Sequence, residues 1–203
     1  MISLVYMVAG LSSRFGGNIK QFAKVGPNGE TFIECSINQA LNYIDKKVFN
    51  KIIFIVGDNT EKGFKKMFGN SYKGIPVFYA KQTFDKIVRD RPWGTADALC
   101  SALPLIDDKC IVCNGDDLYG ENSFRKVINH LQNSGEEITV GITLEKMIPE
   151  EGKVTRGIFK IKDGYLDSAE EVLGLTKENF KEKVPYECLC NMNLFGLNLD
   201  IIK

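Results

Sequence analysis

The residues best suited to chemistry follow the first apolar run of the chain, in the segment MVAGLSSRFGGNIKQF at positions 7–22. This segment holds three glycines, two serine hydroxyls, Arg14 and Lys20. Free backbone N–H groups in a glycine-rich turn cradle phosphate oxygens, while the guanidinium of Arg offers a planar fork and the ammonium of Lys a point charge. We therefore expect the segment to bind an anion, with a plain structural loop as the alternative.

Two familiar phosphate-binding patterns do not fit this segment. A Walker loop needs G-x-x-x-x-G-K-[ST], but five residues separate Gly10 from Gly16, and Gly17 stands where the lysine belongs. The dinucleotide fingerprint G-x-G-x-x-G fails because Ser12 takes the place of the second glycine. The sequence therefore argues against P-loop kinase chemistry and against a nicotinamide-dependent dehydrogenase.

A pair of carboxylates, Asp116 and Asp117, follows another apolar run in the segment NGDDLYG. Oxygen ligands of this kind suit Mg²⁺, which takes one or two carboxylates and completes its shell with phosphates and water. The alternative is that these aspartates cap the helix predicted after them. A magnesium site is the interpretation that fits an anion-binding turn elsewhere in the chain.

Gly94 and Thr95 form a third feature, in the segment RPWGTADAL. They open a predicted helix, and a helix N-terminus lets the backbone approach a ligand closely. Gly-Thr is also simply a good start for a helix. The pattern by itself leaves both interpretations open.

Apolar runs that alternate with amphipathic stretches position these three features. The runs predict strands at 2–9, 51–57, 76–80, 109–115 and 138–144, and the stretches predict helices at 31–44, 60–69, 94–106 and 121–134. Such alternation is typical of a mostly parallel α/β sheet with helices on both faces. In these sheets ligands bind outside the carboxyl ends of the strands, where the glycine-rich turn and the two aspartates are expected.

The pattern changes after about residue 150. Two predicted strands are joined by a turn at 162–164, and a further strand is predicted at 187–197. We interpret this part as a small β insertion within a single domain, 1–203, with a first half at 1–148, which carries all three features, and a second part at 149–203. The last residues, NLDIIK, look like the first turn of a helix, so we expect a reading frame that continues past Lys203.

Composition narrows the class of protein. Lys+Arg and Asp+Glu balance at 26 each, which is not the signature of a nucleic-acid or membrane binder. No apolar run reaches the roughly 18 residues of a membrane span, and the first residues lack the basic region and cleavage site of a signal peptide. The sequence therefore predicts a soluble, cytoplasmic protein.

The cysteines do not form a convincing metal or disulfide framework. Cys110 and Cys113 are three residues apart on a predicted strand, so they point to opposite faces. The only histidine, His130, lies in an amphipathic helix. Ordinary thiols in a reducing compartment are the better interpretation than structural zinc.

Taken in order, the motifs VAGLSSRFGGNIKQF, AKQTF, RPWGTADAL and VCNGDDLYG resemble the sugar-phosphate nucleotidyltransferases. They are most similar to the bacterial-type members whose signature reads GSRYGGLKQ, and the R-x₅-K spacing is shared with molybdenum-cofactor guanylyltransferases and methylerythritol cytidylyltransferases. The resemblance covers nearly all of the chain. It implies the Rossmann-like fold of nucleotide-diphospho-sugar transferases and an Mg²⁺-dependent transfer from an NTP to a sugar 1-phosphate, with release of pyrophosphate.

The resemblance also implies roles for residues that match the family's motifs. Arg14 would grip the β- and γ-phosphates, Lys20 would neutralise the α-phosphate, and Gln82 would meet the base. The backbone of the first loop would hold the nucleotide, and Gly94 with Thr95 would lie beside base and ribose. The nucleotide-binding set is Ala9, Gly10, Leu11, Ser12, Ser13, Gln82, Gly94 and Thr95.

The same resemblance assigns the metal and the acceptor. Asp116 matches the metal-binding aspartate, with Asp117 as its neighbour. The residues that fall where family members contact the sugar phosphate are Gly157, Glu170 (or its neighbour Glu171) and Asn191.

This sequence departs from the family pattern in two ways. Ser12 stands where the family often has glycine, which matters little for backbone contacts. The family's second metal-binding carboxylate, in a later strand, has no match, so nucleotide binding without catalysis is one expected outcome.

The substrates stay open at this point. UTP is the first guess for the NTP, from the resemblance alone, and a phosphorylated small molecule is the expected partner. The alternatives are a cytidylyltransferase acting on an alcohol phosphate such as phosphocholine, which Lys20-Gln21-Phe22 resembles, and a non-catalytic nucleotide-binding homologue. The sequence does not indicate an oligomeric state.

Overall fold

The structure is a computed structural model that describes residues 1–10, 18–42, 48–85, 87–89, 92–185 and 187–202. It forms two compact units: Met1–Thr139 together with Leu194–Lys203, and Val140–Asn193. The strands β6 (Ile138–Thr143) and β9 (Leu189–Asn198) contribute residues to both units. Among the described residues, no helix has the length and apolar character needed to cross a membrane.

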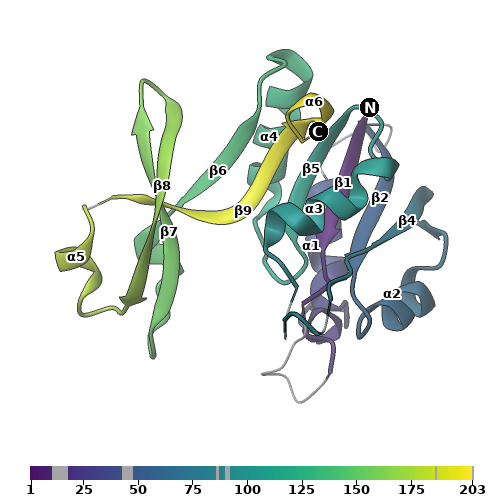
Figure 1. Ribbon diagram of the computed structural model, residues 1–203, viewed down its shortest axis with the longest axis horizontal. Helices are drawn as coiled ribbons and strands as arrows, with labels where there is room; N and C mark the ends of the chain where they lie inside the picture. Colours follow the sequence, from purple (N-terminus) through teal and green to yellow (C-terminus); the bar gives the residue numbers. More distant parts are fainter. Residues whose placement is uncertain (11–17, 43–47, 86, 90–91, 186, 203) are drawn as a thin grey trace. The chain divides into compact units, whose positions relative to one another are not determined.

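The first unit is built on a mostly parallel sheet (Figure 1). Its strands are β1 (Ile2–Met7), β2 (Phe49–Val56), the short β3 (Ser71–Tyr72), β4 (Ile75–Lys81) and β5 (Lys109–Asn114). They lie in the order β3-β4-β2-β1-β5, with β1 parallel to β2 and β5, and β2 parallel to β4. The last residues of β9 run antiparallel to β5. The predicted mixed α/β fold is confirmed, while the two-residue β3 was not predicted.

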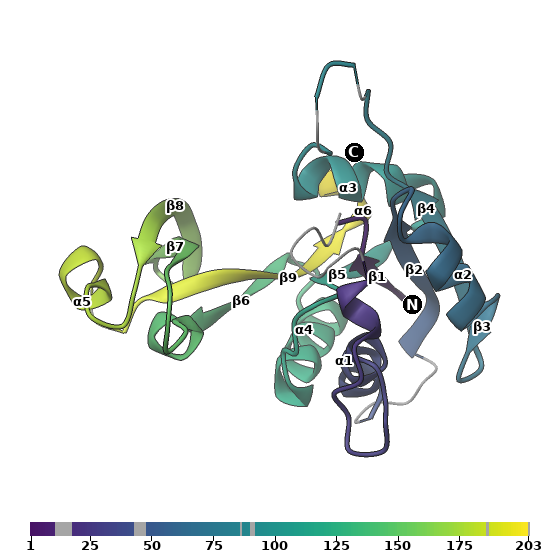
Figure 2. The ribbon, with the colours of Figure 1, turned by 90° about the horizontal axis from the view of Figure 1, so that it is seen from below.

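Helices cover both faces of this sheet. They are α1 (Phe32–Leu41), α2 (Glu61–Phe68), α3 (Thr95–Ala102) and α4 (Glu121–Asn133). Figure 2 shows α3 on one face and α1 and α4 on the other. The predicted helix at 94–106 ends as an α-helix at Ala102 and continues as a 3₁₀ turn over Leu103–Leu105, because Pro104 cannot donate the next helical hydrogen bond.

Local sequence explains where α1 begins. Thr31 accepts a hydrogen bond from the backbone N–H of Glu34, and the Glu34 carboxylate accepts one from the backbone N–H of Thr31. This reciprocal capping box satisfies two donors that the first turn of a helix would otherwise leave unpaired. The capping box therefore fixes the start of α1 at Phe32.

Each face of the sheet buries its own core. On the α3 face, Val5, Ile53 and Val112 pack against Ala98 and Ala102 of the helix. On the other face, aromatic rings form the core. The ring centroid of Phe54 in β2 lies 5.0 Å from that of Phe64 and 4.8 Å from that of Phe68, both in α2. Side chains of the same strands point into both cores, so apolar residues are needed at every position along them. This is why the strands are continuous apolar runs in the sequence.

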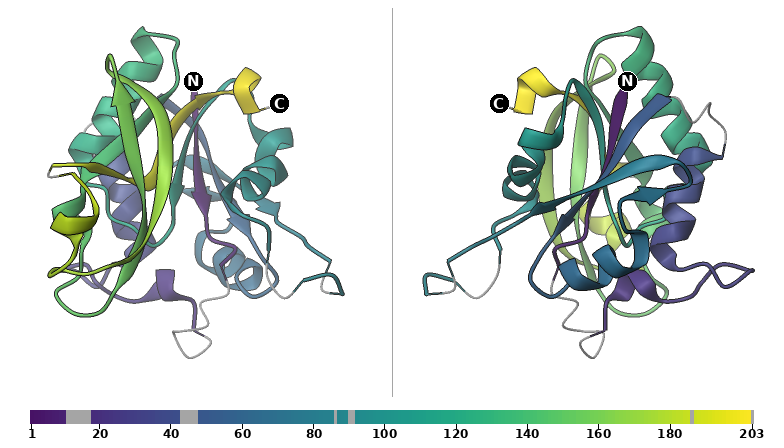
Figure 3. Two further views of the ribbon diagram at one scale, coloured as in Figure 1. Left: turned by 60° about the vertical axis from the view of Figure 1, so that its left-hand side comes forward. Right: turned by 90° about the vertical axis from the view of Figure 1, so that its right-hand side faces the viewer.

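The second unit is dominated by a long antiparallel hairpin, drawn in green to light green in the left-hand view of Figure 3. It consists of β7 (Val154–Lys162) and β8 (Tyr165–Leu175), joined through Asp163 and Gly164, which both have positive φ (52° and 84°). The turn predicted at 162–164 is therefore confirmed. The unit also contains the short helix α5 (Phe180–Lys183), and Ile158 of β7 pairs with Cys190 of β9.

A short helix, α6 (Leu199–Ile202), follows β9 in the first unit. This confirms the helical turn predicted for NLDIIK. Leu199 and Ile202 pack against the core on the α3 face.

Candidate active site

The carboxyl ends of β1, β2, β4 and β5 meet at one edge of the first unit's sheet. Backbone hydrogen bonds extend the ladder past the strands: the N–H of Gln82 donates to the carbonyl of Val56 at 2.9 Å, and that of Val8 to Ile55 at 2.9 Å. Val8 and Gln82, just past the ends of β1 and β4, are therefore held in register with β2. Such an edge is where open α/β sheets bind their ligands.

A cavity of about 350 Å³ opens at this edge, at the N-terminus of α3. Its lining residues are Met7, Ala9, Gly10, Gln82, Pro92, Trp93, Gly94, Thr95 and Ala98. A second cavity of about 180 Å³ shares Ala9, Gln82 and Pro92 with the first. The structure thus brings together five of the eight residues that the sequence suggested for the nucleotide: Ala9, Gly10, Gln82, Gly94 and Thr95.

The glycines at this edge differ in what they contribute. A Cβ at Gly57 would lie 2.9 Å from the carbonyl oxygen of Ala9, so glycine is needed there for two strand ends to approach. At Gly10 and Gly94 a Cβ would meet no atom within 4 Å. Packing within the described part of the chain therefore does not explain these two glycines, whereas close approach of a ligand to the backbone would.

The remaining loop residues suggested for the nucleotide are Leu11, Ser12, Ser13 and Arg14. They lie outside the residues that the structure describes. Their suggested contacts with the nucleotide and its phosphates stay predictions.

Lys20 and Asp116, 96 positions apart, form an ion pair at this edge, with Nζ 3.1 Å from Oδ2. Lys20 begins a short 3₁₀ helix (Lys20–Phe22), and Asp116 follows β5, whose neighbour is β1. Their side chains keep 43% and 38% of their surface exposed. A cation and a carboxylate are therefore accessible beside the strand end that contributes to the cavity.

Asp117 differs from Asp116 in its surroundings. Its Oδ2 accepts a hydrogen bond of 2.7 Å from the side-chain amide of Asn114, and the backbone N–H of Asn114 donates to the hydroxyl of Tyr119 at 3.0 Å. Burial raises the pKa of Tyr119 well above its ordinary value, with further contributions from Cys113 and Asp117, so the ring stays neutral. Asp117 thus supports the turn that presents Asp116.

Neither aspartate caps the following helix. The N-cap of α4 is Gly120, which has no side chain to cap the helix, and its N–H donates to Oε1 of Gln39 at 2.9 Å. The helix-capping alternative for Asp116 and Asp117 is therefore wrong.

A magnesium ion fits the donors at this turn. No group of three or more His, Cys, Asp or Glu side chains gathers within the described ranges, so a site built wholly from protein ligands is not found there. Mg²⁺ does not need one, because it takes one or two carboxylates with phosphates and water. Gln21 packs next to Gly115, and its buried Oε1 has no hydrogen-bond partner among the described residues, which leaves an acceptor available close to Asp116.

In the second unit, two of the three residues suggested for the sugar phosphate come together. A Cβ at Gly157 of β7 would lie 3.6 Å from the Cβ of Asn191 of β9. Glu171 is paired with Gly157 in the hairpin and so shares its face, whereas Glu170 is paired with Ile158. The carboxylate of Glu170 is bound by Lys160 at 2.8 Å, which lowers its pKa. Side-chain alternation along β8 therefore separates Glu170 from the other two and places Glu171 with them.

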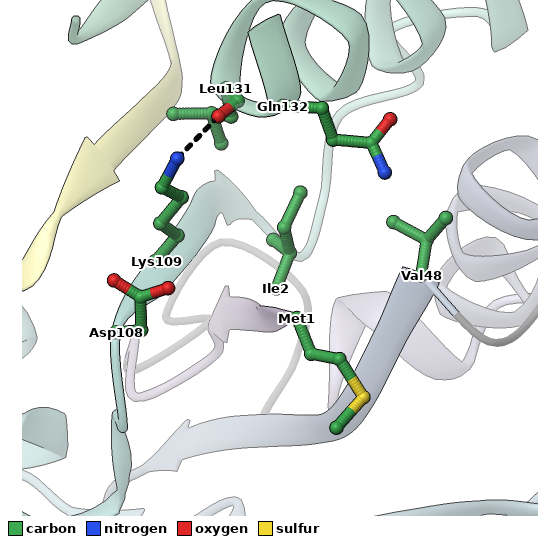
Figure 4. A pocket seen from close by; sticks show the side chains of 7 residues that line it. All are labelled: Met1, Ile2, Val48, Asp108, Lys109, Leu131 and Gln132. Atoms are coloured by element: carbon green, nitrogen blue, oxygen red, sulfur yellow. Dashed lines mark hydrogen bonds between the residues drawn. The ribbon is translucent and has the colours of Figure 1, made fainter. Parts of the chain in front are cut away.

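A further cavity, of about 370 Å³, lies at the opposite ends of β1 and β5 (Figure 4). Its lining residues are Met1, Ile2, Val48, Asp108, Lys109, Leu131 and Gln132. The ammonium of Lys109 donates to the carbonyl of Leu131 at 2.6 Å, in the last turn of α4. Carbonyls in the last turn of a helix lack a partner within the helix, so this lysine has a structural explanation.

Comparison with known protein families identifies the family to which the chain is similar. A family model described as Nucleotidyl transferase matches residues 20–171. A comparison with curated proteins gives no match.

Solved structures of other proteins share the fold of this chain. HddC from Yersinia pseudotuberculosis, complexed with GMP-PN, has a TM-score of 0.60 at 19% identity, over 100% of this chain and 79% of its own. The inositol-1-phosphate CTP transferase from T. maritima has a TM-score of 0.61 at 12% identity, over 100% and 72%. The 4-diphosphocytidyl-2C-methyl-D-erythritol synthase from Anaerococcus prevotii has a TM-score of 0.55 at 14% identity, over 99% and 72%.

Proposed function

This chain belongs to the nucleotidyl transferase family, and on that premise we propose that it joins an NTP to a sugar 1-phosphate and releases pyrophosphate. The donor to test first is UTP, and the reaction depends on Mg²⁺. One observation carries the proposal: the cavity lined by Gln82, Gly94 and Thr95 lies at the sheet edge that also presents the Lys20–Asp116 pair. A base site and a phosphate-binding cation thus share one edge of one sheet.

The reaction needs charge neutralisation more than proton transfer. A phosphate oxygen of the acceptor forms a bond to the α-phosphorus of the NTP, and the bond from that phosphorus to the bridging oxygen of the β-phosphate breaks. The electron pair leaves with pyrophosphate. Because the nucleophile is already an oxyanion, no strong general base is required, and positioning with electrostatic stabilisation supplies the rate.

Two side chains carry that electrostatic part. Lys20, accessible beside the cavity's strand end, binds the α-phosphate and offsets the charge that builds up there. Arg14 binds the β- and γ-phosphates and assists the leaving pyrophosphate. Asp116 would hold Mg²⁺, which would neutralise charge on the phosphates.

The other residues orient the substrates. Gln82 contacts the base, and the backbone at Gly10 and Gly94, where no side chain intervenes, approaches the nucleotide. In the second unit, the row formed by Gly157, Asn191 and Glu171 binds the acceptor phosphosugar. Glu170, which the resemblance suggested first, lies on the opposite face of the hairpin, where Lys160 binds its carboxylate.

The proposal is tested first by thermal unfolding of the protein with Mg²⁺ and each of ATP, GTP, CTP, UTP and dTTP. A ligand at 100 times its dissociation constant adds about 2.7 kcal/mol, a shift of roughly 5–10 °C for a chain of this size. A shift with at least one nucleotide, abolished when EDTA is added, is the expected result. The absence of any shift would overturn the nucleotide site.

Turnover is then measured as pyrophosphate release with a panel of acceptors. Sugar 1-phosphates are expected to support release, whereas phosphocholine and inositol phosphate are not. Release only with an alcohol phosphate would identify a cytidylyltransferase-like enzyme instead. Nucleotide binding without release for any acceptor would identify a non-catalytic homologue.

A further inference from the structure

Gln82 is held on two sides at the centre of the candidate base site. It lies directly after β4, is only 7% exposed, and lines both cavities. Its backbone N–H donates to Val56, and its side-chain Nε2 donates to Oδ2 of Asp97 at 2.7 Å. Asp97 lies in the first turn of α3, the helix whose start lines the larger cavity.

The chemistry of this contact fixes which way round the amide lies. A carboxylate accepts hydrogen bonds and has none to donate, so the amide group that faces Asp97 is the NH₂. The reverse orientation would set the carbonyl oxygen of Gln82 against the carboxylate oxygen of Asp97. Within the described part of the chain, Oε1 of Gln82 receives no hydrogen bond, so it is the acceptor that Gln82 has left for a ligand.

From this geometry we infer that Asp97 is a positioning residue that sets the base specificity of the enzyme. It holds Gln82 so that Oε1 meets an N–H group of the base. The inference rests on the proposed function, because it concerns the base of the nucleotide in that cavity. Asp97 itself is not among the residues that line the cavities, so its action passes through Gln82.

The orientation of the Gln82 amide can distinguish cytosine from uracil, and adenine from guanine. Cytosine and uracil exchange donor and acceptor at position 4 and at N3, and adenine and guanine do so at position 6 and at N1. A fixed amide therefore favours one member of the CTP/UTP pair and one member of the ATP/GTP pair. Discrimination between purines and pyrimidines depends on the room available in the cavity and is separate from it.

The test is to bind the four nucleotides, with Mg²⁺, to the wild type and to the Asp97→Asn variant. Asparagine can either donate to Gln82 or accept from it, so the amide is free to turn over. In the wild type we expect a preference of about tenfold or more within the better-binding pair, as one hydrogen bond provides. In Asp97→Asn we expect that ratio to fall below about threefold or to reverse, with the purine-to-pyrimidine ranking unchanged.

Two further variants separate this role from a general effect. Asp107→Asn removes the same charge from an ion pair with Lys51 outside the cavity lining, and its base ratios should match the wild type. In a Gln82→Ala background, Asp97→Asn should no longer change the ratio, because the two residues act through one contact. A ratio that Asp97→Asn leaves unchanged, or changes equally without Gln82, would overturn the inference.

These outcomes are distinct from failure of the proposed function. If no nucleotide binds the wild type, the nucleotide site itself is wrong. If nucleotides bind and only the ratios fail to respond, the nucleotide site stands and Asp97 does not set its specificity.

Discussion

Replacing Lys20 by alanine is expected to separate catalysis from stability. The ammonium lies 3.1 Å from Asp116, but both side chains are more than a third exposed. An ion pair in that setting contributes about 0–1 kcal/mol to folding, so the midpoint of thermal unfolding should fall by no more than roughly 4 °C. In the transition state the same ammonium would face the phosphate charge directly, and one such electrostatic contact is commonly worth roughly 3–4 kcal/mol.

Lys20→Ala should therefore lower kcat/KM by about two to three decades, with little change in stability. Pyrophosphate release under saturating Mg²⁺ measures the first quantity, and thermal unfolding of the same preparation measures the second. Comparison with the wild type gives the loss of transition-state stabilisation directly.

Lys65→Ala provides a matched control. Lys65 pairs with Glu61 at 2.7 Å on the surface of α2, with exposed fractions of 52% and 27%, and it lies outside the cavity linings. It should show a similarly small effect on stability and wild-type activity. Activity of Lys20→Ala within threefold of wild type would refute the catalytic role, and a loss of several kcal/mol in stability would show that the lysine is structural.

Three other predictions follow from single residues. Gly94→Ala should lower the unfolding midpoint by no more than about 4 °C, since its Cβ meets no atom within 4 Å and alanine at this N-cap costs about 1 kcal/mol or less relative to glycine. It should weaken nucleotide binding about tenfold in a titration, and unchanged affinity would contradict close backbone approach. Phe64→Ala removes a fully buried ring between Phe22 and Phe54. It should lower the free energy of unfolding, measured with denaturant, by about 3–5 kcal/mol. A loss below about 1 kcal/mol would show that the surrounding side chains can fill the space that the ring leaves. Burial raises the pKa of Tyr72 to about 12. Above pH 10 this tyrosine therefore ionises in the unfolded chain but keeps its proton in the folded one, so the free energy of unfolding should fall as the pH rises from 10 to 12. Tyr72→Phe should make that fall measurably shallower.

Much of the fold was predictable because each strand and helix carries its own periodic signal. The run ISLVY and the run KIIFIV are apolar without interruption, and such runs indicate strands covered on both faces. Parallel pairing then requires their carboxyl ends to meet at one edge. The position of Asp116 at that edge follows from sequence alone for this reason, whereas Gln82 was suggested by the resemblance to the family. The two-residue β3 carries no such signal, because two residues show no period.

The choice between adjacent carboxylates needed the tertiary structure. Asp116 and Asp117 are chemically identical in sequence, as are Glu170 and Glu171. Asp117 is held by Asn114, which leaves Asp116 paired with a lysine 96 positions away. The register of the hairpin decides that Glu171, and not Glu170, shares a face with Gly157, since a shift of one residue in a strand reverses its face.

The contact between Gln82 and Asp97 shows most clearly what the sequence alone cannot predict. The sequence by itself placed Gln82 just after a predicted strand and Asp97 in the first turn of a predicted helix, because propensity and periodicity are properties of neighbouring residues. Only the tertiary structure brought the two side chains to 2.7 Å, since that distance depends on how α3 packs against the sheet. Hydrogen-bond partners are selected by packing, and packing is decided by the whole fold.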